Sequence, residues 1–273
     1  MLGLGTGITY GNAIGGWSPE SVARPPTLWF RRNSGIISSE SGDGTSYSPV
    51  RSSEIGNLSD EDKIEQWTGQ GGTALNFRQE TPADMPRFET DTADLGALAF
   101  PQAAKFMDLQ EAGGSTTTVN FTGQFTMLVH CRPTDLSAAR ALLGDTDTEF
   151  LRFGGGGAEL ENTIRMKIDN NAVNFTNGSA NFTTSEYVSI MVTRDENNLC
   201  KLFVYSNTHS STASGLEWGG ETTQAGTVSI SNLGSQADDS NNFQGFIATV
   251  VVWAAALEAE DRTFAFEYAR QRP

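Results

Sequence analysis

The strongest constraint on the fold is an apolar run of nine residues near the C-terminus, GFIATVVVW at positions 245–253. Side chains of a β-strand alternate between its two faces. Here both sets are apolar, with Val250 and Val252 on one face and Val251 and Trp253 on the other. Such a strand has little surface to give to water. We therefore expect it to lie inside a sheet and to be covered on both sides.

Shorter segments with period-two alternation precede this run. They are FTMLVHC (125–131), TIRMKID (163–169) and YVSIMVT (187–193), and the last continues through the polar turn RDENN into CKLFVYS (200–206). The polar turn predicts a hairpin between the last two. No ten-residue helical patterns alternate with the strands, so the pattern favours an all-β antiparallel sandwich over a parallel α/β fold.

One helix is expected, at the C-terminal end of the chain. The segment 257–272 carries Glu260 and Asp261 near its start and Arg270 near its end, which matches the helix dipole. Leu257, Phe264 and Tyr268 fall on roughly one stripe. We expect this short helix to pack on the outside of the sandwich.

Charge and cysteine content narrow the function classes. Lys and Arg total 18 against 33 Asp and Glu, a formal charge of -15. This excludes a general binder of nucleic-acid backbones and argues against adhesion to anionic lipid. No apolar run is long enough to span a bilayer. Cys131 and Cys200 are expected to be small buried hydrophobes rather than a disulfide or part of a zinc cluster.

The N-terminal segment differs in character from the rest. Residues 1–24 are glycine-rich with no sustained period and lack the features of a secretory signal. We interpret them as an extended docking arm ahead of a single domain, 25–273, in which residues 31–61 form long surface loops. The arm residues expected to make assembly contacts are Met1, Leu2, Leu4, Ile8, Tyr10, Ile14 and Trp17, the last anchoring the arm to the domain.

The order of several segments resembles that of concanavalin A-like (laminin-G-like) jelly rolls. The segments are PPTLWF (25–30), DKIEQWTGQGG (62–72), DMPRF (84–88) and GALAFP (96–101), followed by the alternating strands and the strand–acidic-helix ending. The resemblance covers about residues 25 to 273. It implies a concanavalin A-like antiparallel β-sandwich of two packed sheets, with a short C-terminal helix and an extended N-terminal arm.

A second resemblance concerns general sequence character rather than a specific motif. The short apolar-glycine start and the Ser/Thr/Asn/Gly-rich β segments with a low isoelectric point are similar to structural proteins of tailed bacteriophages. This implies a virion location and a capsid decoration, tail or fibre component that docks through its arm. Its partners are then other virion proteins and copies of itself, with a trimer expected from fibre and decoration proteins in general.

Catalytic signatures are absent from the sequence. Glucanases of the resembling fold carry a Glu-X-Asp-X-X-Glu strand that pairs nucleophile and acid, and no segment matches it. DTDTE (145–149) reads as a polar turn, and Gly-X-Ser-X-Gly is missing. We therefore expect a protein that is not an enzyme, with no cofactor unless calcium is bound.

A glycan-binding module for attachment to a host surface is the alternative function. Trp218 lies in GLEWGGETT, which is predicted to be a loop, and is the tryptophan expected to be exposed for stacking on a sugar. Calcium is frequent in the resembling family. The loop carboxylates suited to it are Asp145, Asp147, Asp238 and Asp239. These residues either hold calcium or only form polar turns.

Overall fold

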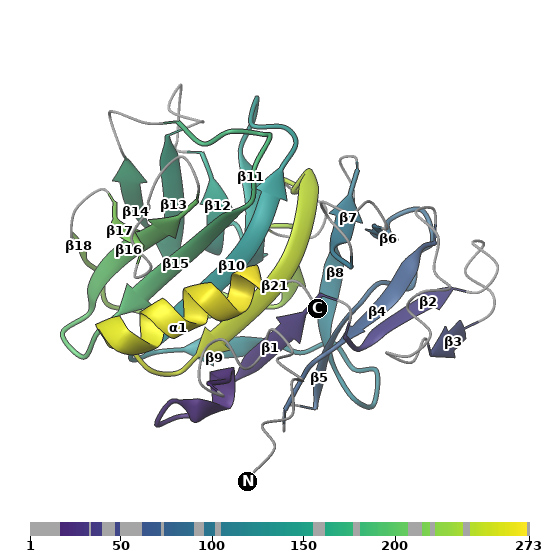
Figure 1. Ribbon diagram of the computed structural model, residues 1–273, viewed down its shortest axis with the longest axis horizontal. Coiled ribbons are helices and arrows are strands. Elements are labelled where there is room, and N and C mark those ends of the chain that lie inside the picture. Colours follow the sequence, from purple (N-terminus) through teal and green to yellow (C-terminus); the bar gives the residue numbers. More distant parts are fainter. Residues whose placement is uncertain are drawn as a thin grey trace, which may run out of the picture.

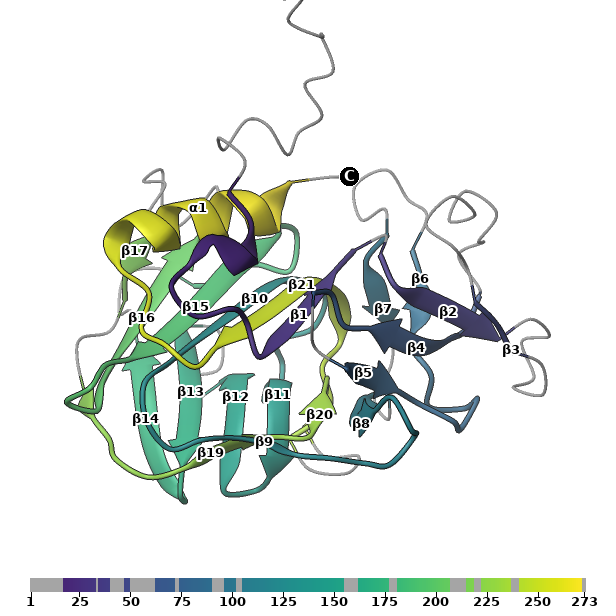
Figure 2. The same cartoon turned by 90° about the horizontal axis from the view of Figure 1, so that it is seen from below.

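The computed structural model describes residues 17–32, 34–39, 47–49, 62–71, 74–89, 96–101, 105–154, 162–176, 181–206, 215–218, 222–236 and 241–271. In these ranges the chain forms two large antiparallel sheets packed face to face, with a C-terminal helix outside one of them (Figures 1 and 2). The prediction of an all-β sandwich with a short C-terminal helix is confirmed.

The first sheet has nine strands among the described residues, in the order β17-β16-β15-β10-β21-β7-β6, with β1 also pairing with β21 and β18 with β16. Its strands are β1 (Leu28–Arg31), β6 (Arg87–Phe88), β7 (Leu98–Phe100), β10 (Phe125–Pro133), β15 (Val188–Arg194), β16 (Leu199–Tyr205), β17 (Leu216–Glu217), β18 (Thr222–Thr223) and β21 (Gly245–Trp253). The predicted hairpin is the β15–β16 pair, in which Arg194 faces Cys200.

The second sheet has ten strands in the described ranges, in the order β14-β13-β12-β11-β20-β8-β5-β4-β2-β3. They are β2 (Ile36–Ser39), β3 (Tyr47–Pro49), β4 (Ile64–Thr68), β5 (Leu75–Arg78), β8 (Met107–Glu111), β11 (Arg140–Thr146), β12 (Glu149–Phe153), β13 (Thr163–Ile168), β14 (Asn171–Thr176) and β20 (Asn232–Leu233). Strands β2 and β3 fall where the sequence predicted only surface loops. That prediction was wrong because Ile36 pairs with Trp67 of β4 and is fully buried, so tertiary pairing overrides the polar composition.

A two-stranded ribbon crosses one end of the sandwich. It consists of β9 (Val119–Phe121) and β19 (Val228–Ile230), and it contributes Phe121, Val228 and Ile230 to the core. Figure 2 shows the ribbon running across the ends of β11 to β14. The ribbon matters for the site below, because the chain that enters β9 forms one wall of a pocket.

Strand β21 is covered on both sides, as its apolar pattern predicts. Val250 and Val252 belong to the core between the sheets, whereas Val251 and Trp253 pack in a second cluster with helix α1 (Ala259–Arg270). All four side chains are fully buried. The strand pairs with β10 along almost its whole length and with β1 and β7 on its other edge.

The start of the described chain packs on this outer cluster. The short 3-10 helix Pro19–Ser21 precedes Val22, which is buried among the side chains that line helix α1. Trp17 stacks on Phe264 with ring centroids 6.1 Å apart. Trp17 thus packs against helix α1, and its role as the anchor of an arm stays a prediction. The other arm residues, Met1, Leu2, Leu4, Ile8, Tyr10 and Ile14, lie outside the described residues.

Among the described residues, no helix combines the length and apolar character that a membrane crossing requires. Cys131 and Cys200 are buried free thiols, as predicted. Burial raises the pKa of both, that of Cys200 to about 11. Neither thiol is suited to act as a thiolate nucleophile, since the reactive form is the deprotonated one.

Candidate functional site

Polar side chains form a row across the outer face of the ten-stranded sheet. Strand β8 points Met107 and Leu109 into the core, which leaves Asp108 on the opposite face. Asp108 is paired with Asn232 of β20, and Asn232 is paired with Gly144 of β11. Local alternation in three strands that are far apart in the sequence thus places an acidic, an amide and a glycine position side by side.

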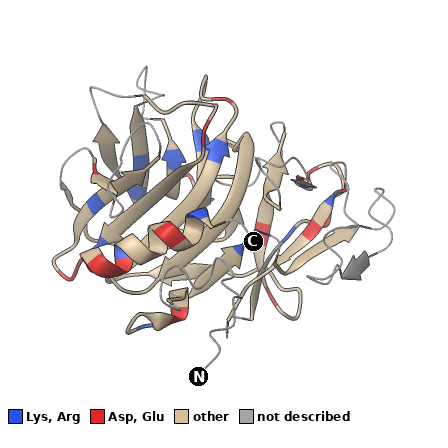
Figure 3. Cartoon of the chain, viewed as in Figure 1, with Lys and Arg blue, Asp and Glu red and all other residues tan. Residues whose placement is uncertain are grey.

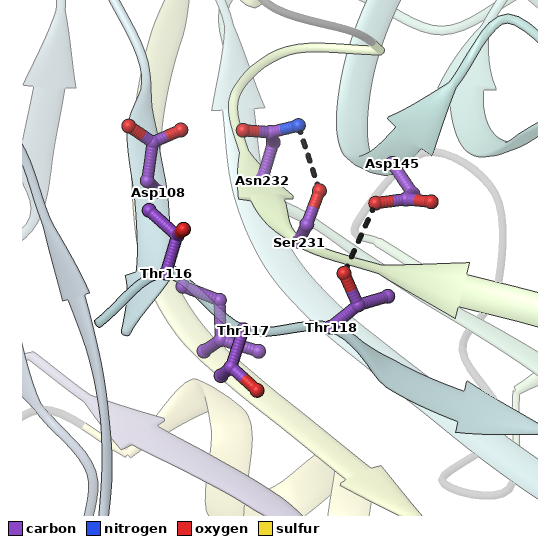
Figure 4. A pocket seen from close by; sticks show the side chains of 8 residues that line it. Asp108, Thr116, Thr117, Thr118, Asp145, Ser231 and Asn232 are labelled. Atoms are coloured by element: carbon purple, nitrogen blue, oxygen red, sulfur yellow. Dashed lines mark hydrogen bonds between the residues drawn. The ribbon is translucent and has the colours of Figure 1, made fainter. Parts of the chain in front are cut away.

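A pocket of about 350 Å³ opens over this row. Its size lies within the range of small-molecule sites, about 300–1,000 Å³. Figure 4 shows Asp108 and Asp145 at opposite ends, with Ser231 and Asn232 between them and the threonines of the segment before β9 along another side. The lining residues are Asp108, Leu109, Thr116, Thr117, Thr118, Asp145, Ser231 and Asn232.

The lining is rich in hydrogen-bonding groups. Thr118 donates its hydroxyl to Asp145 Oδ1 over 3.4 Å, and Asn232 Nδ2 donates to Ser231 Oγ over 3.0 Å. Asn232 is 2% exposed, so its amide is held in place by the surrounding chain. Carboxylates accept hydrogen bonds, while hydroxyls and amides both donate and accept. The pocket therefore offers complementary partners to a ligand that carries several hydroxyl groups.

Gly144 allows a neighbouring chain segment to close one side of this region. A Cβ at position 144 would lie 2.5 Å from the carbonyl oxygen of Gln236 and 2.7 Å from that of Ser235. The backbone of residues 235–236 therefore lies directly on β11, beside the pocket. A side chain larger than hydrogen at position 144 would displace it.

The side chain of Gln236 fixes this segment to its neighbours. Its Nε2 donates to Asp147 Oδ1 over 2.7 Å, and its Oε1 accepts from Arg152 over 2.7 Å and from Asn241 over 3.1 Å. Gln236 is 4% exposed. A buried amide with satisfied donor and acceptor groups gives this segment a defined position.

A second pocket, of about 340 Å³, lies at the other sheet, next to Arg87, Phe100 and Phe246. Phe246 is covered by the guanidinium of Arg132, 4.3 Å from the ring centre. This pocket joins the short strands β6 and β7 to the end of β21 and holds fewer hydroxyl and amide groups. The pocket at Asp108 and Asn232 is therefore the stronger candidate site.

The expectation of an exposed Trp218 was wrong. Trp218 is 2% exposed and belongs to the core, with its ring centre 4.2 Å from that of Phe182. Its backbone nitrogen donates to the carbonyl oxygen of Leu202, which ties the residue to the middle of β16. Burying an aromatic ring of this size stabilises the folded protein more than leaving the ring exposed to water. Trp218 consequently has no face free for stacking on a sugar.

The carboxylates considered for calcium are only partly described. Asp145 lines the pocket, whereas Asp147 receives the Gln236 amide and does not line it. Asp238 and Asp239 lie outside the described residues. Within the described ranges, no three His, Cys, Asp or Glu side chains come together in a group that could hold a metal ion. A calcium site built from all four residues stays a prediction.

Several pocket residues escaped sequence analysis. Asp108 sits in MDLQE, which alternates apolar and polar residues, but it is a single carboxylate with no motif around it. Asn232 and Thr116–Thr118 lie in short segments whose pairing partners are more than 80 residues away or across an unpredictable turn. The only signal was the alternation in β8, which gives a face for Asp108 but not its neighbours.

The sequence also matches a family model. The model described as concanavalin A-like lectin/glucanases superfamily matches residues 110–261, more than half of the chain. The chain belongs to this superfamily. This match confirms the concanavalin A-like resemblance that the order of the sequence segments indicated.

Solved structures with the same fold include glycosidases. A GH54 α-L-arabinofuranosidase soaked with a cyclic sulfate inhibitor has a TM-score of 0.59 at 15% identity, covering 90% of this chain and 62% of that chain. An arabinofuranosidase complexed with arabinofuranosyl-α-1,2-xylobiose has a TM-score of 0.58 at 16% identity, covering 92% and 63%. This chain thus spans less than two thirds of the length of either structure. At such identities the likeness shows the fold alone.

A third solved structure is a domain of a known arabinanase. Domain 4 of AbnA, an extracellular GH43 arabinanase from Geobacillus stearothermophilus, was solved in complex with arabinotriose. It has a TM-score of 0.46 at 12% identity, covering 66% of this chain and 80% of that chain. A comparison of the sequence with curated proteins found no match.

These comparisons correct the expectation that the protein is not an enzyme. Solved structures that share the fold over 90% of this chain include arabinofuranosidases, so the fold gives no ground for excluding an enzyme. The expectation rested on the missing Glu-X-Asp-X-X-Glu strand, which is the arrangement of one group of glucanases. A fold shared by binding modules and hydrolases does not separate the two.

Proposed function

We propose that this protein binds a glycan in the pocket over Asp108 and Asn232. The observation that carries the proposal is the pocket itself, in which carboxylate, amide and hydroxyl side chains converge from β8, β11, β20 and the segment before β9 (Figure 4). Membership of a superfamily of lectins and glucanases supports it. Glycan binding was the alternative in the sequence analysis, and the site now proposed differs from the one at Trp218.

The proposed binding mode follows from the chemistry of the lining groups. Asp108 and Asp145 accept hydrogen bonds from ring hydroxyls, and hydrogen bonds to a charged acceptor are stronger than those between neutral groups. Asn232 is 2% exposed and donates to Ser231 Oγ, so it positions that hydroxyl, and Thr116 to Thr118 orient their hydroxyls to suit the ligand. A ligand that lacks hydroxyls would leave these groups desolvated and unpaired, which gives the pocket its selectivity.

The test is a binding titration with neutral oligosaccharides, using arabino-, xylo-, gluco- and manno-oligosaccharides. Asp145→Asn removes a charged acceptor that is partly exposed and not needed for the core. We expect it to weaken binding about tenfold, the effect of losing one charge-assisted hydrogen bond. Glu111→Gln is the matched control, because Glu111 is exposed at the end of β8 and does not line the pocket. The proposal fails if no oligosaccharide binds, or if both variants bind as the wild type does.

Hydrolysis is a second candidate function, and one observation favours it. Two carboxylates, Asp108 and Asp145, lie at opposite ends of the same pocket (Figure 4). A pair of carboxyl groups flanking the bond to be cleaved is the arrangement that glycoside hydrolysis uses. Release of reducing sugar that is lost in both Asp108→Asn and Asp145→Asn would establish this activity. Binding without release would assign the pocket to recognition.

The virion role and the virion location remain a proposal that rests on the N-terminal sequence. In it, residues 1–16 dock on neighbouring virion proteins or on copies of this chain, while the sandwich presents its glycan pocket to a host surface. The test is a chain that lacks residues 1–16 and keeps Trp17 on helix α1. Loss of incorporation into the particle by a folded protein supports the proposal, and unchanged incorporation refutes it.

A further inference from the structure

Two arginines face each other on the outer face of the ten-stranded sheet. Arg152 of β12 is paired directly with Arg165 of β13, and both are partly exposed. Directly opposite residues of an antiparallel pair have Cβ atoms about 5 Å apart, and like charges in these positions are destabilising. The pair is notable in a chain with a formal charge of -15. Figure 3 shows Lys and Arg on β12 and β13 in this part of the sheet.

Arg165 has no bonding partner among the described residues. Its Nε is buried, and within the described ranges this atom makes no hydrogen bond and the guanidinium forms no ion pair. Other arginines of the chain are engaged: Arg140 pairs with Asp135, and Arg194 donates to three backbone carbonyl groups. A buried donor without a partner costs free energy. Because this Nε is buried, a ligand would reach the Arg165 guanidinium through its outer nitrogens rather than through Nε.

Arg152 is held firmly beside it. Its guanidinium donates to Gln236 Oε1 over 2.7 Å and lies over the ring of Phe150, 4.6 Å from the ring centre. Burial lowers the pKa of Arg152, and the charge of Arg165 lowers it further. Lys167 adds a third positive charge on the same face of β13 and lies 5.7 Å from the Phe150 ring centre. One arginine is thus positioned in advance, and Arg165, which has no partner in the part of the chain that the structure describes, adds a second fork of donors.

The arginine pair and the pocket lie on one face of the sheet. A continuous cross-strand row runs from Lys167 through Phe150, Gly144 and Asn232 to Asp108. Phe150 and Asn232 are two strands apart in this row, which corresponds to about 10 Å. The 235–236 segment rests on Gly144 between them. A single sugar ring cannot reach both places, whereas an oligosaccharide can.

We infer that Arg152 and Arg165 bind the carboxylate of an acidic saccharide, a uronic acid or a similar sugar acid, whose neighbouring residues occupy the pocket. The inference rests on the proposed glycan binding and adds the substrate class. Guanidinium groups match the planar, two-oxygen geometry of a carboxylate and bind it in a bidentate manner.

The experiment compares acidic oligosaccharides with their carboxyl-reduced forms, which keep the ring and the hydroxyls but lose the charge. The probes are oligogalacturonate, oligoalginate and hyaluronan oligosaccharides, titrated by calorimetry at low and high salt. We expect at least one acidic form to bind about tenfold or more tightly than its reduced form, with the difference shrinking at high salt. Arg165→Gln should abolish this preference and leave binding of the reduced form unchanged.

Lys201→Gln is the matched control, since it removes one positive charge from β16 in the other sheet. It should keep the full preference for the acidic form. Thermal denaturation of both variants checks folding, and Arg165→Gln should melt at or above the wild-type temperature because the cross-strand repulsion is relieved.

The outcomes separate this inference from the proposed function. Equal binding of acidic and reduced forms, or a preference that persists in Arg165→Gln, overturns the inference while glycan binding stands. If neutral oligosaccharides bind and no acidic probe binds, the inference is likewise overturned while glycan binding stands. Failure of every saccharide to bind overturns both. Binding that is about tenfold weaker in Asp145→Asn, together with loss of the acidic preference in Arg165→Gln, supports both.

Discussion

The indole nitrogen of Trp253 donates a hydrogen bond to the backbone oxygen of Pro19 over 2.9 Å. Trp253 is the last residue of β21 and is fully buried, and Pro19 is buried at the start of the described chain. The bond joins residues 234 positions apart. It fixes the N-terminal segment beneath helix α1 and closes the outer cluster around Val22.

Replacing Trp253 with Phe should destabilise the fold. The variant leaves the Pro19 carbonyl group buried without a donor and opens space beside the smaller ring, and together these cost about 2–4 kcal/mol. Urea denaturation measures the loss. Trp29→Phe is the comparison, because Trp29 donates to Tyr268 Oη from a partly exposed position and should cost less. Equal stability of wild type and Trp253→Phe would contradict the assigned role of the bond.

Arg194 should tolerate no replacement. Its guanidinium is fully buried and donates to the carbonyl groups of Phe121, Gly123 and Gly226 over 2.8–2.9 Å, tying the β9–β10 turn to the loop before β19. Arg194→Met removes the donors to three carbonyl groups, of which that of Phe121 is in a buried hydrogen bond, and this should cost about 3 kcal/mol. Arg194→Lys should recover only part of this, since an ammonium cannot reproduce the planar fork. Chemical denaturation of the two variants checks the order.

His130 should make stability depend on pH. Burial lowers the pKa of His130 well below its ordinary value, and Arg32 and Arg270 lower it further. The folded protein therefore keeps a neutral ring, with Nδ1 2.8 Å from Ser189 Oγ. The unfolded chain takes up a proton below about pH 6.5. The contribution of His130 to the free energy of unfolding is thus fully present above that pH. It is lost as the pH falls below this value, by about 1.4 kcal/mol per pH unit.

The measurement is the free energy of unfolding between pH 5 and pH 8 for the wild type and for His130→Gln. Other groups titrate in both proteins, so the difference between the two curves isolates His130. We expect that difference to grow below about pH 6.5. Parallel curves would show that His130 keeps an ordinary pKa in the folded protein.

Gly144→Ala should damage both the fold and the pocket. Its Cβ would meet the carbonyl oxygens of Ser235 and Gln236 at 2.7 and 2.5 Å, so the segment beside the pocket must move. We expect a loss of about 1–3 kcal/mol, typical of overpacking, together with weaker glycan binding. Gly113→Ala is the matched control, because no atom lies within 4 Å of a Cβ at that position. Denaturation and binding titrations of the two variants should therefore differ, and equal behaviour would refute the close approach.

The sequence predicts the layers of this fold better than it predicts the site. The apolar pattern of β21 predicts its burial on both faces, because that pattern can be read from the residues of this strand alone. The pocket depends on how distant strands align: Asp108 meets Asn232 only because β20, a two-residue strand, is inserted between β8 and β11. No local pattern specifies that insertion.

Trp218 shows how local composition gives a wrong prediction of burial. Its glycine-rich surroundings predicted an exposed loop, but the backbone pairs with Leu202 and the ring packs on Phe182. Composition describes the neighbours of a residue along the chain, whereas burial depends on neighbours in space. For the same reason the sequence alone does not mark Arg165 as a candidate site residue, because its proposed role depends on Arg152 of the adjacent strand.

The most direct test of the account is to locate a bound glycan by NMR, mapping backbone amide shifts with a saturating oligosaccharide. Glycan binding over Asp108 and Asn232 predicts that the largest changes fall at Asp108, at Thr116–Thr118, at Asp145 and at Ser231–Asn232. Changes confined to the pocket at Arg87 and Phe246, with the first group unmoved, would contradict the central claim.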